Sequence, residues 1–273
     1  MDVRIYSHSG RPGVGQKPRR EGSRPLLPQH ARHCPVLEAG SAMGFLVFAP
    51  VEPNEAVHVS YEGEGKYTCA LFLAGPGGKW DKTFSVAFQL PVGGIGAIGE
   101  QVEFRKSFLT DQNAINMARA FLVPEDLGTP PGGVSLRGAT NFQTPSGWDT
   151  TYLPIFNNIE RPIAPMLVVR VETDWFAHQT EFRYVLQPGE GMSLTHTLPI
   201  GQVAFVPREE VNLVEASAAD IETFHASMDA FFKEKAGHKV SSPYGLQFSP
   251  HYLRSSRAVK DAEKAEKDGG AKG

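Results

Sequence analysis

The expected fold is decided by the stretch Met166-Leu-Val-Val-Arg-Val-Glu-Thr-Asp-Trp175 and by Gln179-Thr-Glu-Phe-Arg-Tyr-Val-Leu186, which follows it. Both runs are rich in β-branched and aromatic residues, a short Phe-Ala-His connection joins them, and Pro188-Gly189 ends the second run. Residues of these types favour strands, whereas Pro-Gly favours a turn. The pattern predicts an antiparallel strand pair at the heart of a β-rich domain.

Composition argues against several classes of protein. The chain of 273 residues is 41% hydrophobic and 10% aromatic, which is typical of a globular protein with its own core. The formal net charge of -3 gives no electrostatic case for nucleic acid as a partner, since phosphate-binding domains carry a basic excess. We expect neither a signal peptide nor a membrane helix, which needs roughly 18 apolar residues in a row. Cys34 and Cys69 cannot form a disulfide framework, so we expect reduced thiols and a cytoplasmic location.

Charge and glycine content divide the chain into three parts. Residues 1–29 form a basic, Gly/Pro-rich arm with little apolar surface, which predicts a solvated or draped extension or, as the alternative, an arm that contacts nucleic acid or an acidic partner. Residues 30–250 carry the β-rich domain. Residues 251–273 are charged and lack an apolar face, which predicts a frayed helix or a disordered tail. Limited proteolysis is expected to remove both ends.

Short runs with strand composition recur through the first half of the domain. Each is rich in β-branched and aromatic residues and is bounded by Pro or Gly. The runs are residues 43–49, 56–61, 67–73, 83–90 and 100–108. Their spacing predicts a mainly β fold: a single β-sandwich or jelly-roll-like domain with two packed helices and flexible termini. Residues 124–148 are rich in Gly and Pro, which predicts a long connection.

Two segments have helical periodicity. Residues 111–122 follow a capping Thr110 or Asp111 and end before Pro124. Residues 218–236 follow Ser217-Ala-Ala-Asp220, which resembles a capping box. The apolar face of this second helix is predicted to pack on the domain. That face consists of Ile221, Phe224, Met228, Phe231 and Phe232.

The segment Gly94-Ile-Gly96-Ala-Ile-Gly99 matches the dinucleotide-binding fingerprint letter for letter. A true fingerprint opens a helix after a strand, whereas residues 100–108 continue with the alternation of another strand. We therefore expect a flexible β connection here, and no cofactor is assigned to it.

Several short motifs, in this order, resemble a bacterial family that is known only as a domain of unknown function. The motifs are Arg32-His-Cys-Pro-Val-Leu-Glu-Ala-Gly-Ser-Ala-Met-Gly44, Leu136-Arg-Gly-Ala-Thr-Asn141, Val171-Glu-Thr-Asp-Trp175, Pro188-Gly-Glu-Gly191 and Phe205-Val-Pro207. The resemblance covers residues 25–235, and Val-Glu-Thr-Asp-Trp is its most specific element. The family continues after this Trp with an apolar-Pro-aromatic stretch and a second Trp, where this chain has Phe176-Ala-His and Tyr184. The family has no assigned activity, so the resemblance implies a domain type and transfers no catalytic residue.

Glu172 and Asp174 are the candidate catalytic residues. At positions i and i+2 of one strand, their carboxylates share a face with Arg170 and lie close enough for acid/base chemistry or for holding a cation. The alternative is an ordinary charged face in solvent. By the same alternation Trp175 falls on the apolar face with Val169, which predicts a buried packing anchor.

His178, Glu181 and His196 are the candidate metal ligands, because they lie within the β-rich region rather than in loops or the tail. A cupin-type site needs three or four such ligands on neighbouring strands around an open position. These residues supply part of that set. The alternative is that both histidines are hydrogen-bonded core or surface residues.

Two functions remain open, because no motif for a nucleophile, a phosphate loop or a metal site is of high specificity. The first is a non-catalytic binding or assembly module, which forms a homo-oligomer or binds another protein through the N-terminal arm. The second is a small-molecule enzyme of cupin-like or jelly-roll type, in one version metal-dependent.

Overall fold

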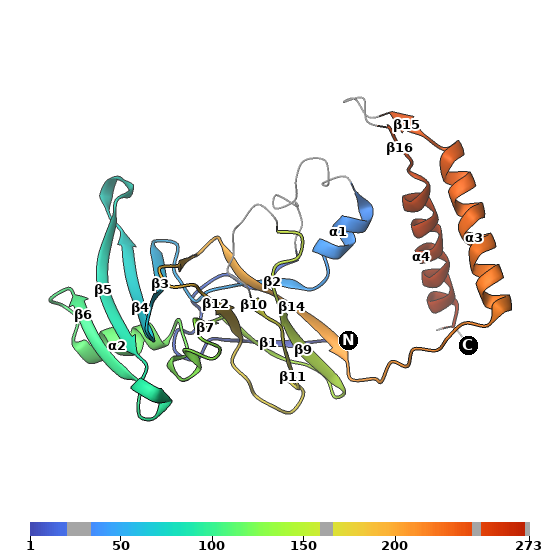
Figure 1. Ribbon diagram of the computed structural model, residues 1–273. Coiled ribbons are helices and arrows are strands. Elements are labelled where there is room, and N and C mark those ends of the chain that lie inside the picture. Colours follow the sequence, from blue (N-terminus) through green and yellow to red (C-terminus); the bar gives the residue numbers. More distant parts are fainter. Residues whose placement is uncertain (21–33, 159–165, 242–246, 271–273) are drawn as a thin grey trace. The chain divides into compact units, whose positions relative to one another are not determined.

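The computed structural model describes residues 1–20, 34–158, 166–241 and 247–270 (Figure 1). The chain divides into two compact units, Met1–Glu209 and Glu210–Gly273. The first unit is built from antiparallel strands, which confirms the expectation of a mainly β fold, and each of its sheets is open. The expected boundary near residue 250 is replaced by one at Glu209.

The largest sheet contains the strands that the sequence indicated most clearly. Its order is β13 (Gly191–Thr195), β3 (Glu55–Gly63), β4 (Lys66–Ala74), β5 (Trp80–Gln89) and β6 (Gly99–Arg105). The glycine-rich connection between β5 and β6 contains a short turn, Val92–Gly94, in which Gly93 and Gly94 have positive φ angles of 73° and 74°. Side chains rarely tolerate that conformation, so the glycines serve the turn, as expected.

Three smaller sheets complete the first unit. The four-stranded sheet has the order β11 (Val169–Val171), β9 (Trp148–Leu153), β14 (Pro199–Pro207) and β2 (Phe45–Phe48). The three-stranded sheet has the order β10 (Met166–Leu167), β12 (Glu181–Val185) and β7 (Gly133–Arg137). The two-stranded sheet pairs β1 (Arg4–Ser7) with β8 (Thr140–Gln143).

The expected strand pair forms over a shorter length than predicted. Met166 and Leu167 pair with Tyr184 and Arg183 in antiparallel register. The chain then changes sheets, because residues 169–171 pair with β9 instead of β12. The strand ends at Val171, and residues 173–175 form a turn. Alternation therefore does not extend to Asp174 and Trp175.

One hydrophobic cluster joins the sheets of the first unit. It includes Tyr67 and Phe84 of the five-stranded sheet, Tyr152 of the four-stranded sheet and Phe182 of the three-stranded sheet. At Gly201, in β14, a Cβ atom would lie 2.1 Å from the ring of Phe182, so only glycine allows this approach. The close approach joins two sheets in one core.

Helix α2 (Asp111–Arg119) lies against β4, β5 and β6 in the region predicted for the first helix. Thr110 caps it, since its side chain accepts a hydrogen bond from the backbone N–H of Asn113 at 3.1 Å. Ala114 and Ala118 are its buried residues. Helix α1 (Pro35–Ser41), β7 and β8 were not predicted, and the last two occupy the segment expected to be a long connection.

The N-terminal arm was predicted to be a solvated or draped extension, and residues 1–20 lie along the β unit rather than free in solvent. β1 pairs with β8, and the buried His8 accepts hydrogen bonds at Nδ1 from the backbone N–H groups of Gly10 and Arg11, both at 3.1 Å. Arg11 forms a two-pronged ion pair with the buried Glu55, at 2.7 and 2.8 Å. These polar contacts hold a segment that has little apolar surface. The rest of the arm, residues 21–29, falls in the range outside the described residues.

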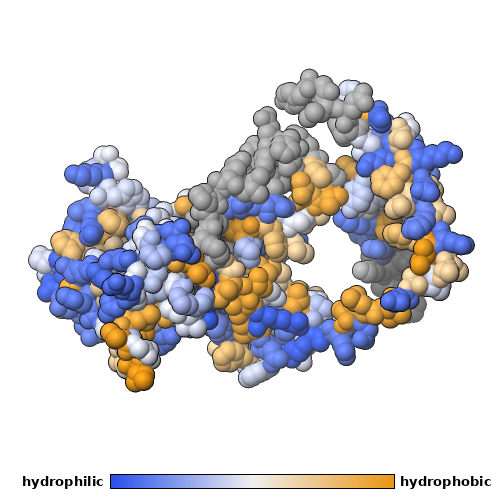
Figure 2. All heavy atoms as spheres, viewed as in Figure 1, coloured by the Kyte–Doolittle hydropathy of each residue, from blue (hydrophilic) through white to orange (hydrophobic). Residues whose placement is uncertain are grey.

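The second unit contains helices α3 (Ala218–Gly237) and α4 (His251–Gly270) and a short strand pair, β15 (Val240–Ser241) with β16 (Gln247–Phe248). The capping box at Ser217 and Asp220 is confirmed. Burial of the apolar face of α3 was predicted, but Phe224 is 66% exposed and no residue of α3 is buried. Residues of high hydropathy accordingly lie at the surface of this unit (Figure 2). The tail, predicted to be a frayed helix or disordered, is helical over residues 251–270.

A chain that ends at Glu209 is expected to fold with an unfolding temperature within about 2 °C of that of the first unit in the full chain. The reason is that the core cluster, among the described residues, contains nothing beyond Phe205. Differential scanning calorimetry of both proteins measures this. A truncated chain that unfolds much earlier, or without cooperativity, would mean that the helices stabilise the β unit.

Candidate functional site

The turn after β11 presents Trp175 to solvent. Its side chain is 69% exposed, so the predicted packing anchor is wrong. The indole is nevertheless held in place, because Nε1 donates to Glu172 Oε2 at 2.5 Å and the Phe176 ring lies 5.7 Å away, centroid to centroid. Beneath the turn, Thr173 is buried and its hydroxyl is hydrogen-bonded to Thr144 at 2.9 Å and to Thr150 at 2.7 Å. The indole therefore offers an apolar surface in a fixed orientation.

A buried carboxylate fastens this turn to the four-stranded sheet. Asp149, in β9, accepts hydrogen bonds from Arg170 Nε at 2.6 Å and from Arg208 Nη2 at 2.6 Å. Arg208 also donates to Asp174 at 2.7 Å, and the backbone N–H of Gly147 donates to the other oxygen of Asp174 at 3.0 Å. Asp149 and Arg208 therefore link the ends of β9, β11 and β14.

This network assigns the two predicted catalytic carboxylates a positioning role. Hydrogen bonds from Arg208 lower the pKa of Asp149 and of Asp174, and the N–H of Gly147 adds to the effect on Asp174. Glu172 accepts from Trp175 and lies 3.8 Å from Arg208. Asp174, ionised and engaged in this way, is a weak general base and carries no proton to donate near neutral pH.

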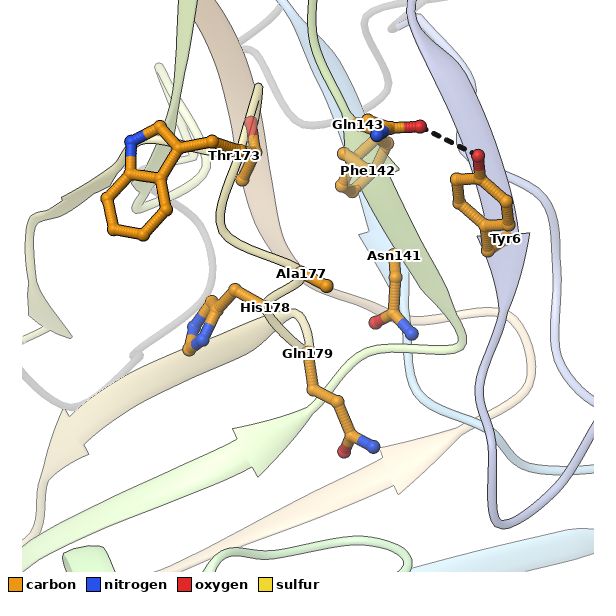
Figure 3. Close-up of a pocket in the computed structure, with 9 residues that line it drawn as sticks. Tyr6, Asn141, Phe142, Gln143, Thr173, Ala177, His178 and Gln179 are labelled. Atoms are coloured by element: carbon orange, nitrogen blue, oxygen red, sulfur yellow. Dashed lines mark hydrogen bonds between the residues drawn. The ribbon is translucent and has the colours of Figure 1, made fainter.

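An open pocket of 310 Å³ lies beside the turn (Figure 3). It is lined by Tyr6 of β1, by residues 141–143 of β8, and by Thr173, Trp175 and residues 177–179 of the following loop. These segments are far apart in the sequence, and only the fold brings them together. Among the described residues, the lining contains aromatic rings, amides and the hydroxyls of Tyr6 and Thr173, and no Asp, Glu, Lys or Arg.

The amide groups of this pocket are held at their carbonyl ends. Asn141 Oδ1 accepts the backbone N–H of Thr180 at 2.9 Å, and Gln143 Oε1 accepts the hydroxyl of Tyr6 at 2.8 Å. Within the part of the chain that the structure describes, the NH₂ groups of both amides have no hydrogen-bond partner, so they are donors for a ligand. Gln179 is engaged at both ends, with Ser9 at 2.7 Å and with Arg137.

The three predicted metal ligands are not brought together. His178 packs against the ring of Phe176, with centroids 5.5 Å apart, and burial lowers its pKa. His196 has a different partner, since its Nδ1 lies 2.9 Å from the carbonyl oxygen of Val51. Within the described residues, no group of three or more His, Cys, Asp and Glu side chains is placed to hold a metal ion.

Glu181 differs from the other acidic candidates. Its side chain is half-buried on β12, and burial raises the pKa to about 6, although Arg137 counteracts the shift. A carboxyl group with a pKa near neutrality can give and take protons. Glu181 is not among the residues that line the pocket, but it follows the loop that carries His178 and Gln179.

Sequence reasoning missed most of the residues that build the site. Tyr6 and Asn141 were assigned to a solvated arm and a long connection, and Asp149 and Arg208 received no role. One signal in the sequence could have indicated the strand just before β8. It is the alternation of residues 134–136, in which Val134 and Leu136 are apolar and are buried in the structure. Nothing in the local pattern could have paired Arg208 with a residue 59 positions away.

The search of protein-family models found no match to the chain. The search of curated proteins likewise returned no match. Among the helices in the described residues, none combines the length and the hydropathy that crossing a membrane requires.

Replacement of Trp175 by Ala is expected to change the free energy of unfolding by no more than about 0.5 kcal/mol, because the side chain is mostly exposed. The matched control is Phe182→Ala, which removes a fully buried ring and should cost about 3–5 kcal/mol. Denaturant unfolding of both variants measures the difference. A loss at Trp175 as large as that at Phe182 would restore the packing role.

His8 is expected to make the stability of the first unit depend on pH. Burial lowers its pKa from 6.5 to about 4, and the charges of Arg137 and Arg11 add to the effect. Between these values the unfolded chain binds more protons than the folded one. The free energy of unfolding should therefore fall as the pH drops through this window, by at most about 3 kcal/mol.

Urea unfolding of the wild type and of His8→Asn, from about pH 7 to about pH 4, isolates this contribution. Asn keeps an acceptor for the N–H groups of Gly10 and Arg11 but does not titrate. Glu181 acts in the opposite direction, because its raised pKa stabilises the fold as the pH falls toward 4.5, yet it is present in both proteins and cancels in the difference. Parallel curves for the two proteins would contradict the assignment to His8.

Proposed function

We propose that this chain is a non-catalytic binding module and that its first unit binds a small ligand at the Trp175 pocket. The observation that carries the proposal is the exposed but fixed indole of Trp175, 69% exposed and hydrogen-bonded to Glu172. A tryptophan ring that is exposed in the free chain can bury apolar surface against a ligand. The fixed ring loses little conformational entropy when a ligand binds.

The polar groups around the pocket support binding rather than chemistry. Asp174 and Glu172 are engaged by Arg208 and Trp175, so they are occupied in holding the turn. Asn141 and Gln143 contribute amide donors, which recognise a ligand without transferring protons to it. A set of orienting amides beside an aromatic ring is the composition of a recognition site.

A β-sandwich or jelly-roll arrangement is the finer form of this fold that we propose. Its support is the larger core cluster, to which the five-stranded and four-stranded sheets both contribute. The resemblance to the bacterial family agrees with the proposal, because its Val-Glu-Thr-Asp-Trp motif contains both the indole and Glu172, which accepts its hydrogen bond. Both remain part of the proposal.

The test is a thermal-shift screen of the full chain against charged and uncharged small metabolites. A true ligand raises the unfolding temperature in the wild type and not in Trp175→Ala, since ligand binding adds RT ln(1 + [L]/Kd) to the stability. Mass spectrometry after incubation should recover the ligand unchanged. If no compound acts through Trp175, or if the ligand is converted to a product, the proposal is wrong.

An enzyme is the second candidate function, and Glu181 is the observation that favours it. Its carboxyl group, with a pKa of about 6, is available for proton transfer near neutral pH. If the chain is an enzyme, the ligand recovered after incubation should have been converted to a product. Glu181→Gln should abolish this conversion while the ligand still binds. Conversion that survives in Glu181→Gln would exclude that role.

Assembly, the other form of a non-catalytic module, would use the second unit. Four large apolar residues of α3 are at least 40% exposed: Ile221, Phe224, Met228 and Phe232. An amphipathic helix whose apolar face is open is stabilised mainly by what covers that face. Light scattering of the full chain and of residues 1–209 tests the homo-oligomer. An assembled full chain and a monomeric truncated chain are expected, and two monomers would exclude self-association.

A further inference from the structure

The chemistry of the Trp175 pocket limits the ligands that it can bind. The described residues that line it include no Asp, Glu, Lys or Arg. Burial holds the pKa of His178 below its ordinary value, so this ring is neutral near pH 7. A charged ligand would lose water in the pocket without gaining a counter-charge, which is costly. The lining therefore favours an uncharged ligand.

The pocket offers its free polar groups as donors at one side. The NH₂ groups of Asn141 and Gln143 are left over once Thr180 and Tyr6 have engaged the amide oxygens. The oxygen of Tyr6 donates its hydrogen to Gln143 and keeps lone pairs that can accept. Hydroxyl groups match this set, because each can accept from an amide and donate to a phenol oxygen.

Trp175 provides an apolar surface beside these donors. The face of an indole is electronegative, and the C–H groups on one face of a sugar ring are weakly electropositive, so the two attract. At 310 Å³ the pocket is at the small end of the range for small-molecule sites, about 300–1,000 Å³. This size fits one or two sugar rings and not a long segment of a polymer.

A second pocket, of 390 Å³, also carries an exposed tryptophan, but its geometry is different. Trp80 lies there with Phe72 and His58 on a single five-stranded sheet. The lining of that pocket contains hydroxyls and no amide side chain. Trp80, 46% exposed, is therefore a matched control for Trp175.

We propose that the Trp175 pocket binds a neutral mono- or disaccharide, an inference that rests on the proposed function. One face of a sugar ring would pack on the indole, and sugar hydroxyls would accept hydrogen bonds from Asn141 and Gln143. Saturation-transfer NMR on the full chain tests this with glucose, N-acetylglucosamine, maltose and lactose as probes. At least one of them should bind with a Kd on the order of 1 mM. Saturation should be strongest at the C–H groups of one ring face.

The variants identify the contacts. Trp175→Ala should weaken binding about tenfold, whereas Trp80→Ala should leave it unchanged. Asn141→Asp keeps the acceptor for Thr180 and replaces the donor by an oxygen, so it should weaken binding several-fold without unfolding the chain. Equal losses in Trp175→Ala and Trp80→Ala would overturn the proposal.

N-acetylglycinamide, an uncharged compound with peptide groups, and glucose 6-phosphate separate the possible failures. If N-acetylglycinamide binds through Trp175 and no sugar does, the saccharide assignment is wrong and the binding module stands. If glucose 6-phosphate binds more tightly than glucose, the argument from the uncharged lining is wrong. If no probe binds up to about 50 mM, the saccharide assignment fails, and the thermal-shift screen decides the proposed function separately.

Discussion

The site depends on the buried carboxylate of Asp149, which binds Arg170 from one neighbouring strand and Arg208 from the end of the other. A buried charge is costly unless it is paired and hydrogen-bonded, and two arginines satisfy Asp149 on both oxygens. Because Arg208 also binds Asp174, the same contact fixes the turn that follows β11. The orientation of Trp175 follows from that turn.

The rest of the pocket is built by segments that carry little apolar surface of their own. β1 is exposed along its length, yet it pairs with β8 and brings Tyr6 beside Gln143. The ion pair of Arg11 with Glu55 and the buried ring of His8 hold the chain that follows β1. Polar contacts therefore place both walls of the pocket, while the hydrophobic cluster holds the sheets beneath it.

Local pattern predicted those elements whose stability is local. In the largest sheet β3, β4, β5 and β6 were visible as alternation, and Thr110 at the start of α2 and the capping box at Ser217 were visible as caps. The change of sheet after Leu167 could not be predicted in this way, because the pairing of β11 with β9 is decided by residues far away in the sequence. Trp175 was assigned to the wrong face for the same reason, since alternation ends where the strand ends.

Candidate site residues were found by type and misjudged by environment. Glu172 and Asp174 do lie together beside Trp175. Their role is determined by Arg208, which binds Asp174 from 34 positions away in the sequence. The metal candidates His178 and His196 have separate partners, Phe176 and Val51. Long-range contacts of this kind decide the protonation state and the exposure of each side chain. The local hydrophobic periodicity of a single sequence does not reveal such contacts.

Hydrogen exchange in Asp149→Asn tests most directly whether this carboxylate holds the site. The amide of Thr173 donates to Val171 at 2.9 Å, and that of Phe176 donates to Glu172 at 3.0 Å, so both report on the turn. If Asp149 holds the turn, these two amides should exchange at least about tenfold faster in the variant while the amides of β3, β4 and β5 keep their wild-type rates. Unchanged exchange at Thr173 and Phe176, or equal acceleration throughout the β unit, would contradict the account.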